Sequence, residues 1–157
     1  MFQSKRIQHV YSHTLDANAS QIFPLLCPVR EYDWIDGWAC DMVYSNSGVA
    51  ENNCIFTTDF PEEGKEVWVI TRYEKNRAIE FVRVSQEMTA TKLDISLLEA
   101  EDRGTTLVWT YTTTGLSHSG NERLEAKTKA AFQGKMAHLD AMLRHFLETG
   151  KKLTLAR

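Results

Sequence analysis

The strongest constraint on the fold is a change in hydrophobic period between residues 38–116 and residues 119–150. In the first stretch, short segments alternate apolar and polar side chains, which is typical of β-strands with one buried face. In the second, apolar residues recur at steps of three and four, which is typical of an amphipathic helix. A sheet with one face to bury, followed by a helix with one stripe to bury, predicts that the two pack on each other.

The first stretch is expected to form an antiparallel meander, because its strand-like segments are joined by short turns. Its strands are predicted at residues 38–45, 53–60, 65–74, 77–85, 89–100 and 105–116. A further strand is predicted at 6–15, and two short helices are predicted at 21–27 and 28–35. Ser20 is the expected N-cap of the first short helix, and Gly37 the expected end of the second.

The last stretch predicts one helix over residues 119–150, with a capping box of Ser119 and Glu122 at its start and Gly150 at its end. No linker or internal repeat interrupts the chain, so residues 1–157 are interpreted as one domain. The predicted fold class is α+β: a curved antiparallel sheet wrapped around a long C-terminal helix, with two short helices between the first and second strands.

Hairpin register indicates which side chains share the interior face. If Lys75 and Asn76 form a two-residue turn, the strands on either side pair so that Arg72 faces Ile79, Ile70 faces Phe81 and Trp68 faces Arg83. A three-residue turn at 101–103 predicts the pairs Leu97 with Leu107, Ile95 with Trp109 and Leu93 with Tyr111. The opposite face of the first hairpin is also apolar (Val67, Val69, Val82 and Val84), so the pattern leaves open which face of residues 65–85 is interior.

The aromatic face contains two arginines and a tyrosine, which a pure packing core would exclude. Ligand sites combine apolar walls with a few polar groups. The candidate cavity residues are therefore Trp34, Trp38, Phe56, Trp68, Ile70, Arg72, Phe81, Arg83, Ile95, Trp109, Tyr111, Phe132, Met136 and Leu139. The alternative is that both arginines lie near strand ends and reach water, with Arg83 stacked on Trp68.

Composition disfavours several classes of partner. The net charge of −3 and the scattered basic residues do not favour nucleic acid. No apolar run is long enough to cross a membrane, and the N-terminus lacks the apolar core of a signal peptide. Three cysteines without a C-x-x-C pair favour reduced thiols in a cytoplasmic protein.

The sequence contains no motif for a metal or a nucleotide cofactor, and none is expected. His9 and His13 are four residues apart on a strand, and His138 and His145 are seven apart on a helix, too far to share one ion. No Walker A or G-x-G-x-x-G loop is present. Tyr111, Asp59 and His13 are candidate acid–base groups by residue type, although no motif marks them.

The order of elements, together with "ASQIFPLLCPVREYDWIDGWACDMVYS" at residues 19–45, resembles the helix-grip fold of the START and pollen-allergen-like superfamily, also called SRPBCC. That superfamily includes polyketide cyclase/dehydrase-like proteins. The resemblance implies a deep cavity between the sheet and the long helix that holds lipids, sterols, polyketides or similar molecules. The superfamily shares no catalytic motif, so no catalytic residue is assigned.

Three interpretations follow. The first is binding of a small hydrophobic or amphipathic ligand between the sheet and residues 119–148. The second is a cyclase or dehydratase that uses the same cavity without a metal or nucleotide cofactor. The third is an interaction module or homodimer with a filled core. In the first two, Trp34 and Trp38 place residues 28–38 at the mouth of the cavity, as a lid or as a plug.

Overall fold

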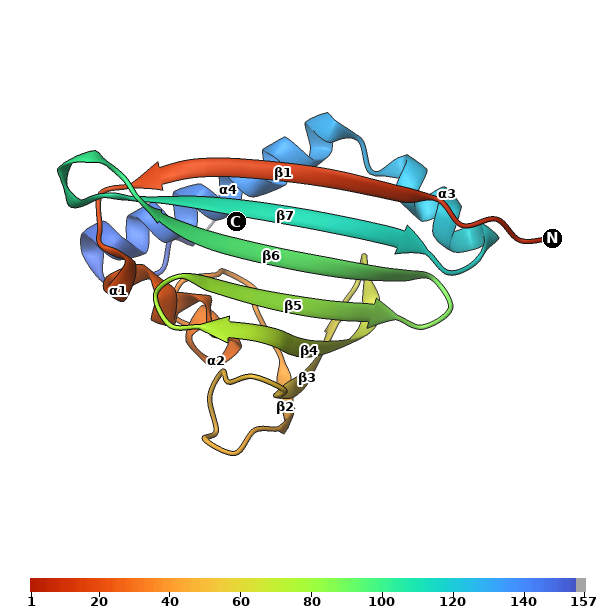
Figure 1. The fold of residues 1–157 in the computed structure, drawn as a ribbon, viewed down its shortest axis with the longest axis horizontal. Coiled ribbons are helices and arrows are strands. Elements are labelled where there is room, and N and C mark those ends of the chain that lie inside the picture. The colour runs from red at the N-terminus through yellow and green to blue at the C-terminus, as the bar shows by residue number, and fades with distance from the viewer. Residues whose placement is uncertain (155–157) are drawn as a thin grey trace.

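One curved antiparallel sheet dominates the computed structural model, which describes residues 1–154. Its strand order is β1-β7-β6-β5-β4-β3-β2, with α4 (Lys129–Thr149) along one face and α1 (Ala19–Ile22) and α2 (Pro28–Glu31) at one end (Figure 1). The strands are β1 (Arg6–Leu15), β2 (Asp41–Tyr44), β3 (Ile55–Phe60), β4 (Gly64–Glu74), β5 (Ala78–Ser85), β6 (Thr89–Glu99) and β7 (Thr105–Gly115). The predicted α+β class and the sheet wrapped around a C-terminal helix are confirmed.

The short helices between β1 and β2 begin at strong local signals. They are α1 (Ala19–Ile22), the 3-10 turn η1 (Phe23–Leu26) and α2 (Pro28–Glu31). Asn18, rather than the predicted Ser20, caps α1, because Gln21 three residues on completes a reciprocal capping box. Pro28 opens α2 as predicted, but the helix ends at Glu31, and Gly37 lies in the turns beyond it with a φ of 83°.

The predicted single C-terminal helix is wrong in one respect, since the chain forms two helices. They are α3 (His118–Ala126) and α4 (Lys129–Thr149). Lys127 leaves the helical conformation, and the Thr128 hydroxyl accepts a hydrogen bond from the amide of Ala131 as a new N-cap. Ser117 caps α3 in place of the predicted Ser119, and Gly150 ends α4 with a positive φ as predicted.

The β6–β7 hairpin has the predicted register, with Leu97 opposite Leu107, Ile95 opposite Trp109 and Leu93 opposite Tyr111. Its turn contains the 3-10 turn η2 (Glu101–Arg103). In the β4–β5 hairpin, Trp68 faces Arg83 and Ile70 faces Phe81 as predicted.

The predicted pairing of Arg72 with Ile79 is wrong. The turn has three residues instead of two, and a bulge between Ile70 and Arg72 shifts the register. Arg72 therefore lies opposite Glu80, and its half-exposed side chain pairs with Glu74 at 2.9 Å. This placement removes Arg72 from the candidate cavity.

The interior face of β4 and β5 is the aromatic one. Trp68 and Ile70 are buried, whereas Val67 is 44% and Val84 39% exposed on the outer face. The buried cluster on the inner face joins the sheet to α4 through Met136. No helix within residues 1–154 is long and apolar enough to cross a membrane.

Candidate functional site

Arg83 is the cation on the inner face of the sheet. Its side chain is 16% exposed, and its guanidinium carbon lies 5.0 Å from the Trp68 ring centroid and 5.9 Å from that of Tyr111. The indole N–H of Trp68 donates to the Thr58 hydroxyl at 2.9 Å, which fixes the ring. The arginine is thus held against two aromatic rings in a partly desolvated setting, where cation–π attraction is stronger than at an exposed site.

The hydrogen-bonding capacity of Arg83 is incompletely used. Its Nε lies 3.5 Å from Glu66 Oε2 but makes no hydrogen bond, although it is buried. Burial raises the pKa of the 4%-exposed Glu66 side chain, and the charge of Arg83 only partly offsets that rise. A buried donor without an acceptor is costly, so this N–H is suited to a ligand oxygen.

Tyr111 and Glu31 are two further polar residues that are strongly desolvated. Burial raises the pKa of Tyr111 to about 12 and that of Glu31 to about 8. Both side chains nevertheless retain partial accessibility.

The candidate cavity residues named from the sequence do not include Glu31. Arg30 pairs with Asp33 at 2.8 Å on the exposed side. Cys27 and Trp34, four residues before Glu31 and three after it, are both buried. These spacings place the two apolar side chains close to Glu31, but they do not by themselves indicate that its carboxyl is desolvated.

Charged side chains gather at the end of the interior near the break between α3 and α4. Lys127 Nζ lies 3.1 Å from Glu63 Oε2. Burial would raise the pKa of Glu63, but Lys127 and further cations lower it overall. Burial lowers the pKa of Lys135 on α4, although the Lys135 side chain keeps accessible surface. This cluster gives the apolar interior a polar rim.

His13, a candidate acid–base group by residue type, lies in a hydrogen-bond network between the sheet and α4. The indole N–H of Trp109 donates to His13 Nε2 at 2.9 Å, and His13 Nδ1 lies 2.7 Å from Asp140 Oδ1. Arg144 also donates to Asp140, at 2.8 Å. Because both ring nitrogens are engaged, the network joins α4 to β1 and β7 and leaves no free nitrogen for a substrate.

The other predicted cavity residues form the apolar surroundings. Fully or nearly fully buried are Trp34, Phe56, Trp68, Ile70, Phe81, Ile95, Trp109 and Met136, while Trp38, Phe132 and Leu139 are partly buried. Contact of any of them with a ligand stays a prediction.

Residues 28–38 are braced to their surroundings by side-chain hydrogen bonds. The indole N–H groups of Trp34 and Trp38 donate to the carbonyl oxygens of Leu25 and Pro28. The Tyr32 hydroxyl donates to the carbonyl oxygen of Cys40. Such bracing is what a plug requires, and whether the segment moves with ligand stays a prediction.

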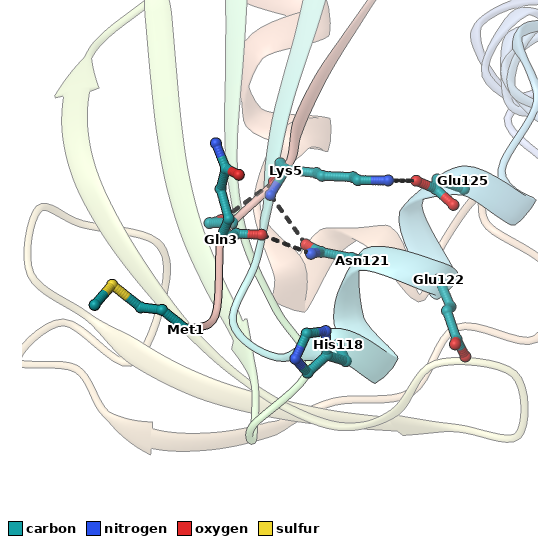
Figure 2. Close-up of a pocket in the computed structure, with 8 residues that line it drawn as sticks. Met1, Gln3, Lys5, His118, Asn121, Glu122 and Glu125 are labelled. Atoms are coloured by element: carbon teal, nitrogen blue, oxygen red, sulfur yellow. Dashed lines mark hydrogen bonds and ion pairs between the residues drawn. The ribbon is translucent and has the colours of Figure 1, made fainter.

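A surface groove of about 580 Å³ lies away from this interior, between the N-terminal segment and α3 (Figure 2). Asn121 bonds there to the backbone of Gln3 and Lys5, and Lys5 pairs with Glu125. These polar contacts hold the N-terminal segment against α3. Within residues 1–154, no cluster of three His, Cys, Asp or Glu side chains could hold a metal ion.

Comparison with known proteins supports the fold. No protein-family model matches the chain, and no curated protein matches it. Norcoclaurine synthase of Thalictrum flavum, solved with a transition-state analogue, is 11% identical with a TM-score of 0.69, over 96% of this chain and 100% of that one.

Two further structures give similar values. An uncharacterized protein of Rhizobium leguminosarum is 17% identical with a TM-score of 0.65, over 93% of this chain and 97% of that one. DynU16, from the dynemicin biosynthetic locus, is 16% identical with a TM-score of 0.63, and the match spans 92% of this chain but 48% of DynU16. These neighbours and the topology of the chain show that it has the helix-grip fold that its sequence predicts.

Proposed function

We propose that the protein binds a small amphipathic molecule between the sheet and α4, with the polar end of the ligand at Arg83. The observation that carries the proposal is the guanidinium of Arg83, enclosed by aromatic rings and left with an unpaired buried N–H. A filled core gains nothing from such a group, whereas a ligand oxygen would satisfy it.

The surroundings of Arg83 support the same proposal. Trp68, Phe81 and Phe132 supply apolar and aromatic walls, which suit a hydrocarbon or ring system. The partial accessibility of the desolvated Tyr111 supports open space beside Arg83. The neighbouring structures add support from the fold alone, since helix-grip proteins include one solved with a small molecule bound.

Matched eight-carbon probes test the proposal. Octanoate and 1-octanol share one tail and differ in their head group, and their binding is measured by isothermal titration calorimetry and by quenching of tryptophan fluorescence. We expect octanoate to bind about 10- to 100-fold more tightly than octanol, since a charge-assisted hydrogen bond contributes about 1.5–3 kcal/mol. Arg83→Gln should abolish this preference and leave octanol binding nearly unchanged.

Arg72→Gln is the matched control, because Arg72 lies on the neighbouring strand but points outward to Glu74. It should leave both affinities at the wild-type value. Absence of binding for both probes would refute the proposed function. Equal loss of octanoate binding in the two arginine variants would refute the assigned role of Arg83.

A second candidate function is a cyclase or dehydratase reaction in the same interior. The observation in its favour is that the ring of Tyr111, whose pKa is raised by burial, lies with its centroid 5.9 Å from the guanidinium carbon of Arg83. Together they could donate hydrogen bonds to a carbonyl oxygen that gains negative charge during enolisation. The test is cyclisation of a linear triketide thioester. Tyr111→Phe should slow turnover at least tenfold, and no turnover by wild type would refute this candidate.

A further inference from the structure

His9 on β1 has a buried ring nitrogen that the fold does not use. Its Nε2 is shielded from solvent and has no hydrogen-bond partner among residues 1–154. His13 lies four residues on, on the same face of the strand, and both of its ring nitrogens are engaged, by Trp109 and by Asp140. A buried polar atom without a partner is costly, so a histidine with a purely structural role should resemble His13.

Aromatic contacts place the His9 ring in the wall of the proposed site. The ring stacks on Phe132 of α4, with 4.7 Å between the centroids and 16° between the planes. Phe132 also contacts the ring of Tyr111, with 5.4 Å between the centroids, and Tyr111 lies opposite His9 on the neighbouring strand β7. The imidazole is therefore held under α4, on the inner face of the sheet that also carries Tyr111.

The unpaired nitrogens of His9 and Arg83 lie on opposite sides of Tyr111. In the sheet, β1 with His9 borders β7 on one side, and β5 with Arg83 lies beyond β6 on the other. The guanidinium carbon of Arg83 reaches to 5.9 Å from the Tyr111 ring centroid. Because neighbouring strands are about 4.8 Å apart, the two nitrogens are separated by roughly 10 Å. The inner face thus has two unused polar groups, one at each end of an aromatic surface.

We propose that His9 is a second polar anchor of the ligand site, so that the preferred ligand has an anionic group for Arg83, an apolar middle, and a hydroxyl group for His9 roughly 10 Å away. This inference rests on the proposed function and adds the second polar group and its position. A hydroxyl suits His9 because it can both donate and accept, and so it bonds Nε2 in either imidazole tautomer. A ligand without that hydroxyl leaves the nitrogen unpaired.

Octanoate, 8-hydroxyoctanoate and 2-hydroxyoctanoate test the inference by isothermal titration calorimetry at neutral pH. The two hydroxy acids are isomers, and the 8-hydroxyl is the one that can reach His9 from a carboxylate held at Arg83. We expect wild type to bind 8-hydroxyoctanoate about 2- to 10-fold more tightly than octanoate, from one hydrogen bond formed in a buried site. 2-Hydroxyoctanoate should show no such gain. This comparison uses wild type alone and so is independent of any variant.

His9→Phe keeps an aromatic ring against Phe132 and removes the nitrogen. The variant should bind 8-hydroxyoctanoate about tenfold more weakly than octanoate, because the hydroxyl is then buried without a partner. Its affinity for octanoate should match that of wild type. His118→Phe is the matched control, because His118 is exposed at the start of α3 and contacts the ring of Phe2. It should retain the wild-type preference, and circular dichroism verifies that both variants are folded.

Three results would each overturn the inference. They are wild-type protein that binds 8-hydroxyoctanoate no more tightly than octanoate, an equal gain with 2-hydroxyoctanoate, and a preference for 8-hydroxyoctanoate that survives in His9→Phe. In each case binding of octanoate leaves the proposed function intact. Absence of binding for all three acids overturns both.

Discussion

Replacement of Asp140 by alanine should destabilise the protein more than is usual for a polar residue on a helix at the protein surface. Asp140 lies 2.7 Å from Nδ1 of His13, whose side chain is 5% exposed, and it accepts a hydrogen bond from Arg144. Trp109 occupies the other ring nitrogen of His13. The ring cannot turn to find another acceptor without losing that bond, so Asp140→Ala leaves a buried donor unpaired.

The magnitude follows from that unpaired donor. An unsatisfied buried group costs about 1–3 kcal/mol, and the carboxylate is charged, so we expect a loss of roughly 2–3 kcal/mol. For a chain of this size, that corresponds to a melting temperature lower by roughly 5–10 °C. It also corresponds to a urea midpoint lower by about 1 M, with the slope unchanged.

The assay is urea unfolding at pH 7, followed in parallel by tryptophan fluorescence and by circular dichroism at a helix band. Asp33→Ala is the control, because Asp33 also pairs with an arginine but its side chain is 48% exposed. An exposed pair contributes about 0–1 kcal/mol, so this variant should unfold close to wild type. Asp140→Asn keeps an acceptor for His13 and should recover part of the loss. Equal midpoints for Asp140→Ala and Asp33→Ala would refute the reasoning.

Four further predictions concern other parts of the chain. Thr128→Ala removes the N-cap of α4 and should lower the free energy of unfolding by about 1 kcal/mol, with faster amide exchange at Ala131. Trp34→Phe removes the donor to the Leu25 carbonyl oxygen and should cost about 1–2 kcal/mol. If residues 28–38 are a plug, their amide exchange in the wild-type protein should be the same with and without octanoate, and faster exchange on binding would contradict that interpretation. Because the folded pKa of Glu31 is raised from 4.5 to about 8, stability should fall as pH rises through this window, by roughly 3–4 kcal/mol at most. Glu31→Gln should flatten that fall in urea unfolding at pH 5 and pH 8, and an unchanged slope would show that Glu31 titrates normally.

Short-range patterns accounted for most of the fold. The register of β6 and β7 follows from one turn and one alternation, so Trp109 and Tyr111 could be placed on the inner face from sequence. The same reasoning failed for Arg72, because a bulge inserts one extra residue and turns every later side chain to the other face. Nothing in the alternation of β4 marks that bulge.

The candidate site was predicted only in part. Arg83 could be found as a charged residue in an aromatic pattern, and the structure places it against Trp68 and Tyr111. Glu31 could not be assigned in the same way, since its sequence neighbours offer ordinary surface partners. Its environment depends on β7 and on the segment before β2, which are distant in sequence.

The sequence by itself determined the order of strands and helices, the β6–β7 register and the packing of an amphipathic helix on one face of the sheet. These features depend on hydrophobic period and turn chemistry, which act over a few residues. Only the tertiary structure decided where α3 ends and α4 begins, and which arginine enters the interior. Those outcomes depend on desolvation and on partners from distant segments, and neither is encoded in the local pattern around the residue concerned.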